Sequence, residues 1–218
     1  MNILYVHGMG GGGDSRIPRL LNEYFQDKEF GGEKVNVVAR TYDFDPEIGR
    51  VQLLGWFEEL KPALVIGESL GAIQAIRLRG VPHILVSPSL GAPDNLYGRA
   101  WAVSIPGIQL YLHLKFRVKK GDRQKLKFRR RILLKYKAHW EDALKNMPAN
   151  GSKDYFYAFF GTQDHYMKQG IVRIDMYEKY FGKSYTVYEG SHFMEEPHIY
   201  NLLIPKILEV LNLCSKTE

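Results

Sequence analysis

The sequence predicts an α/β fold in which helices cover both faces of an open, mostly parallel sheet. Short apolar runs with the length of buried strands alternate along the chain with longer segments of helical periodicity. The runs show little polar alternation, which is typical of strands buried on both faces of a parallel sheet. With 218 residues and 45% hydrophobic composition, the chain can bury one substantial core. We therefore expect a single domain over residues 1–218.

Six apolar runs have the length and residue content of strands. The first begins at Asn2, and Val35, Val37 and Val38 mark the second. β-Branched residues such as valine are enriched in strands because they pack well on a pleated surface. We expect strands at residues 2–6, 34–41, 63–66, 83–87, 155–160 and 184–188.

The segments between these runs carry signals for helix starts and ends. Pro18 falls in the first turn of the first helix, where its missing amide hydrogen is harmless. Asp45 and Pro46 open the second helix, and Gly80 ends the third. The last segment carries its apolar residues on one stripe. We expect helices at residues 17–25, 45–60, 73–78, 170–181 and 197–213.

Composition limits the cellular setting. No apolar run approaches 18 residues, the length of a membrane-spanning helix. The first residues are typical of a strand and do not show the basic region and cleavable apolar segment of a signal peptide. We expect no membrane span and a cytoplasmic protein. Cys214 is the only cysteine, which excludes an intrachain disulfide and a four-thiolate metal site. Cys214 lies near the end of the last predicted helix, and we expect it to have no catalytic role.

The net charge of +6 is concentrated in one segment. From Lys115 to Lys137 there are seven Lys and five Arg against one acid, a net +11 that leaves −5 for the rest of the chain. A protein that binds nucleic acid through its general composition would spread its basic residues more widely. We therefore expect no nucleic-acid partner.

The pentapeptide Gly67-Glu68-Ser69-Leu70-Gly71 lies between a predicted strand and a predicted helix. In this context Gly-x-Ser-x-Gly forms a nucleophile elbow, a sharp turn that holds its serine in a strained positive-φ conformation above the sheet. The flanking glycines avoid collisions with the neighbouring strand and helix. Ser69 is thus the candidate nucleophile, with the Leu70 amide pointing at the group it attacks.

Two further strand ends carry residues that would complete such a site. Asp164 follows the fifth predicted strand and His192 follows the sixth. The order Ser, Asp, His is typical of hydrolases with a nucleophile elbow. His192 would act as general base and Asp164 would orient it. The competing acids are Asp154, Asp175 and Glu189, and Asp164 could alternatively be a helix N-cap. The other histidines near strand ends and in helices, His83, His113, His139, His165 and His198, are expected to be surface or packing residues.

The first loop, from Gly8 to Gly13, has two interpretations. It satisfies the Gly-x-Gly-x-x-Gly dinucleotide fingerprint, but Asp14 would place a negative charge beside the pyrophosphate. The other interpretation is an oxyanion hole, in which the Met9 amide joins that of Leu70. We favour the oxyanion hole because it shares a site with Ser69.

These motifs together resemble the α/β-hydrolase superfamily, over all of the chain except about residues 90–150. The residues that carry the resemblance are His7-Gly8-Met9-Gly10, residues 67–72, Gly161-x-x-Asp164 and Gly190-Ser191-His192-Phe193. Within the superfamily the chain is similar to the small bacterial YqiA-like esterases. The resemblance implies a three-layer α/β/α sandwich with strand order 2-1-3-4-5-6, and serine-esterase chemistry without cofactor or metal.

Residues 90–150 fall where this superfamily usually places a helical lid. We expect one helix from Asp122 to Met147, with an apolar face formed by Leu126, Leu133, Tyr136, Trp140, Leu144 and Met147. This helix could simply pack on the core and expose a solvated basic face. Alternatively, it could attract an anionic substrate or partner through Arg129, Arg130, Arg131 or Lys135.

The sequence therefore predicts a serine hydrolase that cleaves a small-molecule carboxylic ester or thioester through an acyl-enzyme on Ser69. The substrate could be anionic if the basic insertion contributes to binding. A catalytically silent, hydrolase-like binding protein and, less favoured, a nucleotide-binding oxidoreductase are the alternatives.

Overall fold

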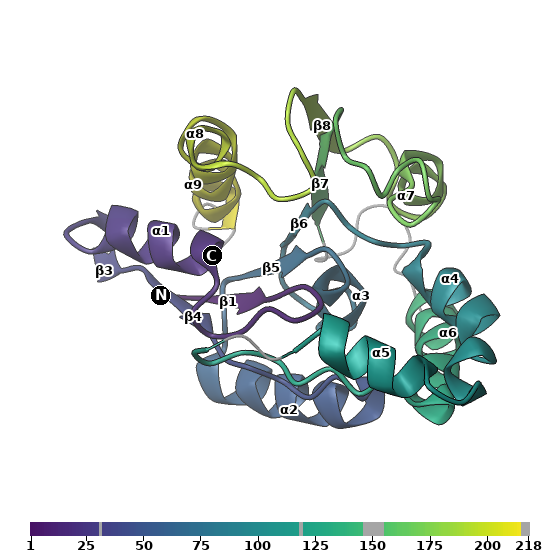
Figure 1. Ribbon diagram of the computed structural model, residues 1–218. Coiled ribbons are helices and arrows are strands. Elements are labelled where there is room, and N and C mark those ends of the chain that lie inside the picture. Colours follow the sequence, from purple (N-terminus) through teal and green to yellow (C-terminus); the bar gives the residue numbers. More distant parts are fainter. Residues whose placement is uncertain (31, 118–119, 146–154, 215–218) are drawn as a thin grey trace.

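Six parallel strands form a single sheet in the computed structural model, which describes residues 1–30, 32–117, 120–145 and 155–214 (Figure 1). The spatial order is β4-β1-β5-β6-β7-β8, which confirms the predicted order 2-1-3-4-5-6. Every neighbouring pair is parallel, so the carboxyl ends of all six strands meet at one edge. The strands are β1 (Asn2–Val6), β4 (Asn36–Ala39), β5 (Leu64–Glu68), β6 (His83–Val86), β7 (Phe156–Gly161) and β8 (Tyr185–Tyr188).

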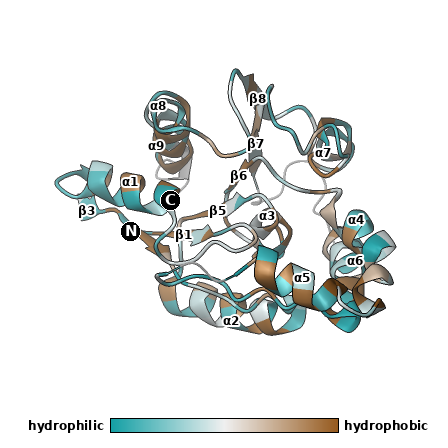
Figure 2. Cartoon of the chain, viewed as in Figure 1, coloured by the Kyte–Doolittle hydropathy of each residue, from teal (hydrophilic) through white to brown (hydrophobic). Residues whose placement is uncertain are grey.

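The sheet is buried on both faces, which divides the core in two. Leu4 and Val65 point into one half, and Ile3 and Ile66, one residue away in each strand, point into the other. One face is covered by α1 (Arg16–Phe25), α8 (Glu196–His198), the π-helical turn η2 (Ile199–Leu203) and α9 (Ile204–Cys214). The other is covered by α2 (Pro46–Leu60), α3 (Gly71–Ala75), α6 (Arg130–Lys145) and α7 (Ile174–Phe181). This is the predicted three-layer sandwich (Figures 1 and 2).

Some predicted boundaries are wrong. The strand expected at 34–41 is shorter, because residues 33–34 (β3, Glu33–Lys34) pair with β2 (Glu29–Phe30) in a small antiparallel hairpin. The helix after the elbow ends at Ala75, because Arg77 and Leu78 donate to carbonyls only three residues back and tighten the chain into turns. Helix α7 starts at Ile174, since the Ile171 amide bonds back to the Tyr166 carbonyl.

The single helix expected from Asp122 to Met147 is also wrong at its start. Helix α6 begins at Arg130, and the residues from Asp122 to Arg129 form neither helix nor strand. The reason is that the Gln124 amide donates to the Gly11 carbonyl, 2.7 Å away in another loop, so it is unavailable for helical bonding. Met147 lies outside the described residues.

The insertion between β6 and β7 has two parts of different character. Helix α6 belongs to the core: Tyr136 and Trp140 are buried, and the Tyr136 hydroxyl donates to the Phe44 carbonyl at 2.7 Å. Before it come α4 (Ala92–Arg99), the 3-10 turn η1 (Ala102–Ser104) and α5 (Ile108–Lys115). Helix α5 contains no buried residue. Within the described residues, no helix has the length and apolar content needed to cross a membrane.

Candidate active site

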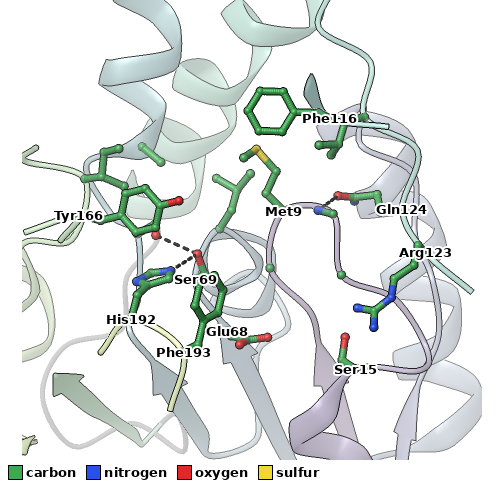
Figure 3. Close-up of a pocket in the computed structure, with 18 of the residues that line it drawn as sticks. Met9, Ser15, Glu68, Ser69, Phe116, Arg123, Gln124, Tyr166, His192 and Phe193 are labelled. Carbon is green, nitrogen blue, oxygen red and sulfur yellow. Dashed lines mark hydrogen bonds between the residues drawn. The ribbon is translucent and has the colours of Figure 1, made fainter. Parts of the chain in front are cut away.

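Ser69 sits at the tight turn that joins β5 to α3. Its φ of 52° lies in the left-handed region, where a residue with a Cβ is strained. Space around the turn requires glycine, since a Cβ on Gly71 would lie 2.3 Å from the His7 carbonyl oxygen. The predicted elbow geometry is therefore present, with the Ser69 hydroxyl at the carboxyl edge of the sheet (Figure 3).

A continuous chain of hydrogen bonds connects the three predicted site residues. His192 Nε2 lies 2.8 Å from Ser69 Oγ, and His192 Nδ1 lies 2.7 Å from Asp164 Oδ2. Both His192 and Asp164 are only 2% exposed. An imidazole between a carboxylate and a hydroxyl donates its Nδ1 hydrogen to the acid and leaves Nε2 to accept from the serine. The arrangement places a base on the candidate nucleophile.

The other acids considered for this role do not reach the imidazole. Asp175 is exposed and pairs with Arg173, and Glu189 is exposed. Asp154 lies outside the described residues. Asp164 also receives the Tyr166 amide on its Oδ1 atom at 2.8 Å, so both carboxylate oxygens are engaged.

The loops that carry Asp164 and His192 are tied to each other. The Gln163 amide donates to the Gly190 carbonyl at 2.9 Å. The Ser191 hydroxyl donates to Glu195 at 2.5 Å, and the Tyr166 ring packs edge-on against the His192 ring with centroids 4.6 Å apart. Fixing neighbours on both sides limits the rotamers that the imidazole can adopt, which keeps it aimed at Ser69.

Ser89 is a site residue that sequence reasoning did not assign. Its hydroxyl lies 3.1 Å from Ser69 Oγ, and its amide donates to the Ser69 carbonyl at 3.1 Å. Because the Ser69 hydrogen points to His192, Ser89 is the donor in the contact between the two hydroxyls. A signal was available: Ser89 follows the fourth strand just as Asp164 follows the fifth, at the same edge of the sheet.

The glycine-rich loop after β1 lies directly against the elbow. A Cβ on Gly8 would be 2.9 Å from the Ser69 Cβ, and Met9 and Leu70 both line the pocket beside Ser69. Within the described residues, the Met9 amide donates to no protein acceptor. The two predicted oxyanion donors are thus brought to the same site as the nucleophile.

Four further backbone amides of this loop already have hydrogen-bond acceptors within the protein. Those of residues 10–13 donate in turn to Gln124, the Gly8 carbonyl, Ser15 and Thr41. The segment at Asp122 also covers the loop so closely that a Cβ on Gly12 would lie 1.7 Å from the Asp122 carbonyl oxygen. A dinucleotide site needs such amides free to face a pyrophosphate. This geometry disfavours the fingerprint interpretation and explains the glycines by the approach of the insertion.

Gln124 clasps the loop from the insertion, and no sequence signal identified it. Its side-chain carbonyl accepts from the Gly10 amide at 3.2 Å, and its side-chain amide donates to the Tyr42 carbonyl at 3.1 Å. Its own backbone amide donates to the Gly11 carbonyl. The side chain is only 3% exposed. Figure 3 shows it on the opposite side of Met9 from Ser69 and His192.

His7 packs against the glycine-rich loop that follows β1. It is fully buried, its Nδ1 lies 2.8 Å from the Gly8 carbonyl, and its ring stacks on Tyr42 with centroids 4.3 Å apart. Burial lowers the His7 pKa to about 4, so the ring is neutral at neutral pH and donates to Gly8 from Nδ1. The Tyr42 hydroxyl in turn donates to the His7 carbonyl at 2.7 Å.

The site opens into a cavity of about 710 Å3 that is lined by both the sheet edge and the insertion (Figure 3). Four cationic side chains line it: Arg16, Lys115, Arg117 and Arg123. The lining described here includes none of the predicted anion-binding residues Arg129, Arg130, Arg131 and Lys135. Lys135 is instead paired with the start of α2, where hydrogen bonds to Glu47 and Asp45 raise its pKa. Within the described residues, no group of three or more His, Cys, Asp or Glu side chains is placed to hold a metal ion.

No family model and no curated protein matches this sequence. Solved structures do match it over nearly its whole length. The chain has the α/β-hydrolase fold. A monoacylglycerol lipase from Paleococcus ferrophilus is 18% identical, with a TM-score of 0.60 over 96% of this chain and 93% of that one. An esterase from Exiguobacterium antarcticum is 10% identical, with a TM-score of 0.56 over 99% and 92%. A peroxisomal α/β-hydrolase from Saccharomyces cerevisiae is 17% identical, with a TM-score of 0.55 over 96% and 76%.

The α/β-hydrolase fold accounts for the position of the site. In open parallel sheets the ligand lies beyond the carboxyl ends of the strands, at the point where the strand order reverses. Here that point lies between β1 and β5. The elbow, the acid loop and the histidine loop all leave that edge. The similarity to YqiA-like esterases within this fold stays a prediction.

Proposed function

We propose that the protein is a serine hydrolase that cleaves a carboxylic ester or a thioester through an acyl-enzyme on Ser69. The observation that carries the proposal is the unbroken hydrogen-bonded chain from Asp164 through His192 to a strained serine at a cavity. Such a chain allows the hydroxyl to lose its proton as it attacks, which a lone serine does poorly at neutral pH.

The geometry supports a distinct role for each residue in this proposal. Ser69 attacks the carbonyl carbon while its proton passes to His192 Nε2, and Asp164 stabilises the imidazolium that forms. The Met9 and Leu70 amides receive the negative charge on the tetrahedral intermediate. His192 then gives the proton to the leaving alcohol or thiol, and a water molecule repeats the sequence to release the acid. These steps use only groups of this chain.

The cavity supports a substrate of small-molecule size. Its volume of about 710 Å3 falls in the range of ligand sites, and Leu96, Phe116, Leu126 and Ile171 provide apolar lining for an acyl chain. The structural neighbours include a monoacylglycerol lipase and an esterase, which is compatible with ester substrates. We further propose that the whole chain acts as one cytoplasmic domain, with residues 90–150 as the insertion that shapes the pocket.

A fluorophosphonate probe tests the proposal. The folded protein should be labelled stoichiometrically, and Ser69→Ala should abolish labelling and lower kcat on p-nitrophenyl esters by at least about 10³-fold. Ser104→Ala, which changes an exposed serine away from the pocket, is the matched control and should label like the wild type. If folded protein is not labelled and Ser69→Ala leaves esterase activity unchanged, the proposal of an acyl-enzyme on Ser69 fails; absence of any esterase activity would favour the catalytically silent alternative.

A further inference from the structure

Large apolar side chains are exposed together on the first part of the insertion. We call them the apolar patch: Tyr97, Trp101, Ile105, Leu110, Tyr111 and Leu114. Trp101 is 65% exposed and Leu110 is 62% exposed. Single exposed apolar residues are ordinary, but six within 18 residues of sequence are not. Such a group of exposed apolar side chains is typical of a surface that binds another apolar surface.

Short-range hydrogen bonds order the backbone of the segment that carries the patch. The Ser104 amide donates to the Trp101 carbonyl, and the Ile108 amide donates to the Ile105 carbonyl. On α5, the half-buried Ile108 and Leu112 face the protein, and Leu112 packs against the core. Leu110 and Leu114, also four residues apart, share a face that is open to solvent. Figure 2 shows hydrophobic colour along much of α5, at the periphery of the fold.

The charge near the patch is mainly positive; the exposed Asp94, three residues before Tyr97, is paired with Lys137 at 3.2 Å. From Asn95 to Gly121 the sequence contains five Lys or Arg residues and no Asp or Glu. Arg99, Lys115, Arg117 and Lys120 are exposed, and the Lys115 ammonium lies 5.5 Å from the Tyr111 ring centroid. Aromatic and aliphatic side chains beside Lys and Arg are typical of segments that lie in the interface of an anionic bilayer. A two-fold contact between copies would instead bring cations against cations, which disfavours a second copy as the occupant.

The patch residues are neighbours in sequence of residues that line the pocket. Leu96 lies next to Tyr97, and Lys115 and Phe116 directly follow Leu114; all three line the cavity that holds Ser69. The segment that carries the patch thus also contributes to the pocket wall. We propose that the apolar patch docks this protein on an anionic lipid surface, and that the ester it cleaves is taken from that surface. The second half of this statement rests on the proposed hydrolase function.

Vesicle binding tests the docking step without catalysis. Ser69→Ala protein is sedimented with vesicles of phosphatidylcholine, with and without phosphatidylglycerol. We expect binding only to the anionic vesicles, reversal by added salt, and a blue shift of tryptophan emission on binding. Leu110→Gln combined with Leu114→Gln should weaken binding by at least about tenfold, because two side chains lose their apolar burial. Val51→Gln, which changes an apolar residue that is 70% exposed on α2, is the matched control and should bind normally.

The catalytic arm uses otherwise unmodified protein and compares two esters. The ratio of the rate on a vesicle-borne acyl ester to the rate on a water-soluble ester should fall about tenfold in the Leu110/Leu114 double variant. Equal vesicle binding by the double variant and the control overturns the docking proposal. So does a concentration-dependent dimer that the double variant abolishes, since the patch is then an interface between copies. Absence of fluorophosphonate labelling with normal vesicle binding overturns the hydrolase function and leaves docking intact.

Discussion

Gln124→Leu should damage catalysis although residue 124 touches neither the nucleophile nor its base. The Gln124 side chain accepts from the Gly10 amide at 3.2 Å and donates to the Tyr42 carbonyl at 3.1 Å, and so connects the insertion to the glycine-rich loop after β1. Leucine fills similar space but offers neither an acceptor nor a donor. The substitution therefore removes the side-chain clasp and leaves the backbone bond from residue 124 to Gly11 in place.

The expected loss can be estimated from these two bonds. Each of the two backbone groups left without a partner costs about 1–3 kcal/mol, so the free energy of unfolding should fall by about 2–6 kcal/mol. Catalysis should suffer separately, because Gly10 is next to Met9, whose amide is a proposed oxyanion donor. Loss of a whole donor costs about 3–4 kcal/mol of transition-state stabilisation, and a displaced one costs part of that. We expect kcat to fall by about 10–100-fold, with little change in KM.

Steady-state kinetics on a soluble ester, together with urea unfolding, measures both effects. Gln124→Glu is the informative companion because it keeps an acceptor for the Gly10 amide but replaces the donor to Tyr42 with an oxygen that faces the Tyr42 carbonyl. It should retain more of kcat than Gln124→Leu even if it is no more stable. Gln26→Leu makes the same change at an exposed position after α1 and should alter neither quantity. If Gln124→Leu loses stability yet keeps kcat within about twofold of the wild type, the clasp has no part in catalysis.

Three other perturbations test the site and its support. Asp164→Asn should lower kcat by about 10²–10⁴-fold, because the amide favours the wrong imidazole tautomer; near wild-type turnover would mean that another acid holds His192. Ser89→Ala should lower kcat by only about fivefold, the worth of one hydrogen bond to Ser69, and a loss beyond 10²-fold would give Ser89 a direct catalytic role. His7 has a folded pKa of about 4, below the value near 6.5 of an unfolded histidine, so the unfolded state binds the extra proton between these values. Stability should therefore be full above about pH 6.5 and decline toward pH 4 by about 3 kcal/mol, and urea unfolding of His7→Gln should lack this part of the decline.

The fold and the three central site residues could be predicted because their signals are local. Buried parallel strands are visible in a sequence as short apolar runs, and the carboxyl ends of parallel strands lie at the same edge of the sheet. Ser69, Asp164 and His192 each follow such a run within a few residues, so knowledge of distant packing was not needed to bring them together. The elbow added a second constraint, since its strained serine at φ 52° requires small neighbours that are visible in the sequence.

The parts that could not be predicted depend on contacts between distant segments. Helical periodicity suggested that Leu126 continues the face of α6, but the backbone there bonds to Gly11 and the side chain lines the pocket. Likewise, Lys135 looked available for an anion until its partners Asp45 and Glu47 were placed beside it by the packing of α6 on α2. No sequence pattern within residues 122–137 indicates that Gly11 or the start of α2 lies nearby. The cations that do line the pocket, Lys115 and Arg117 among them, lie earlier in the same basic segment.

The insertion is not a separate cap on an otherwise complete fold. Its last helix supplies Tyr136 and Trp140 to the core, and the side chain of Gln124 in its middle segment bonds to the glycine-rich loop after β1. The glycine at position 12 is explained by this dependence, because only a residue without a Cβ leaves room for the Asp122 carbonyl. The loop and the insertion are therefore adapted to each other. The same insertion carries the apolar patch, part of the pocket wall and Gln124, so the segment proposed to meet the lipid surface belongs to the insertion that bonds to the glycine-rich loop beside Ser69.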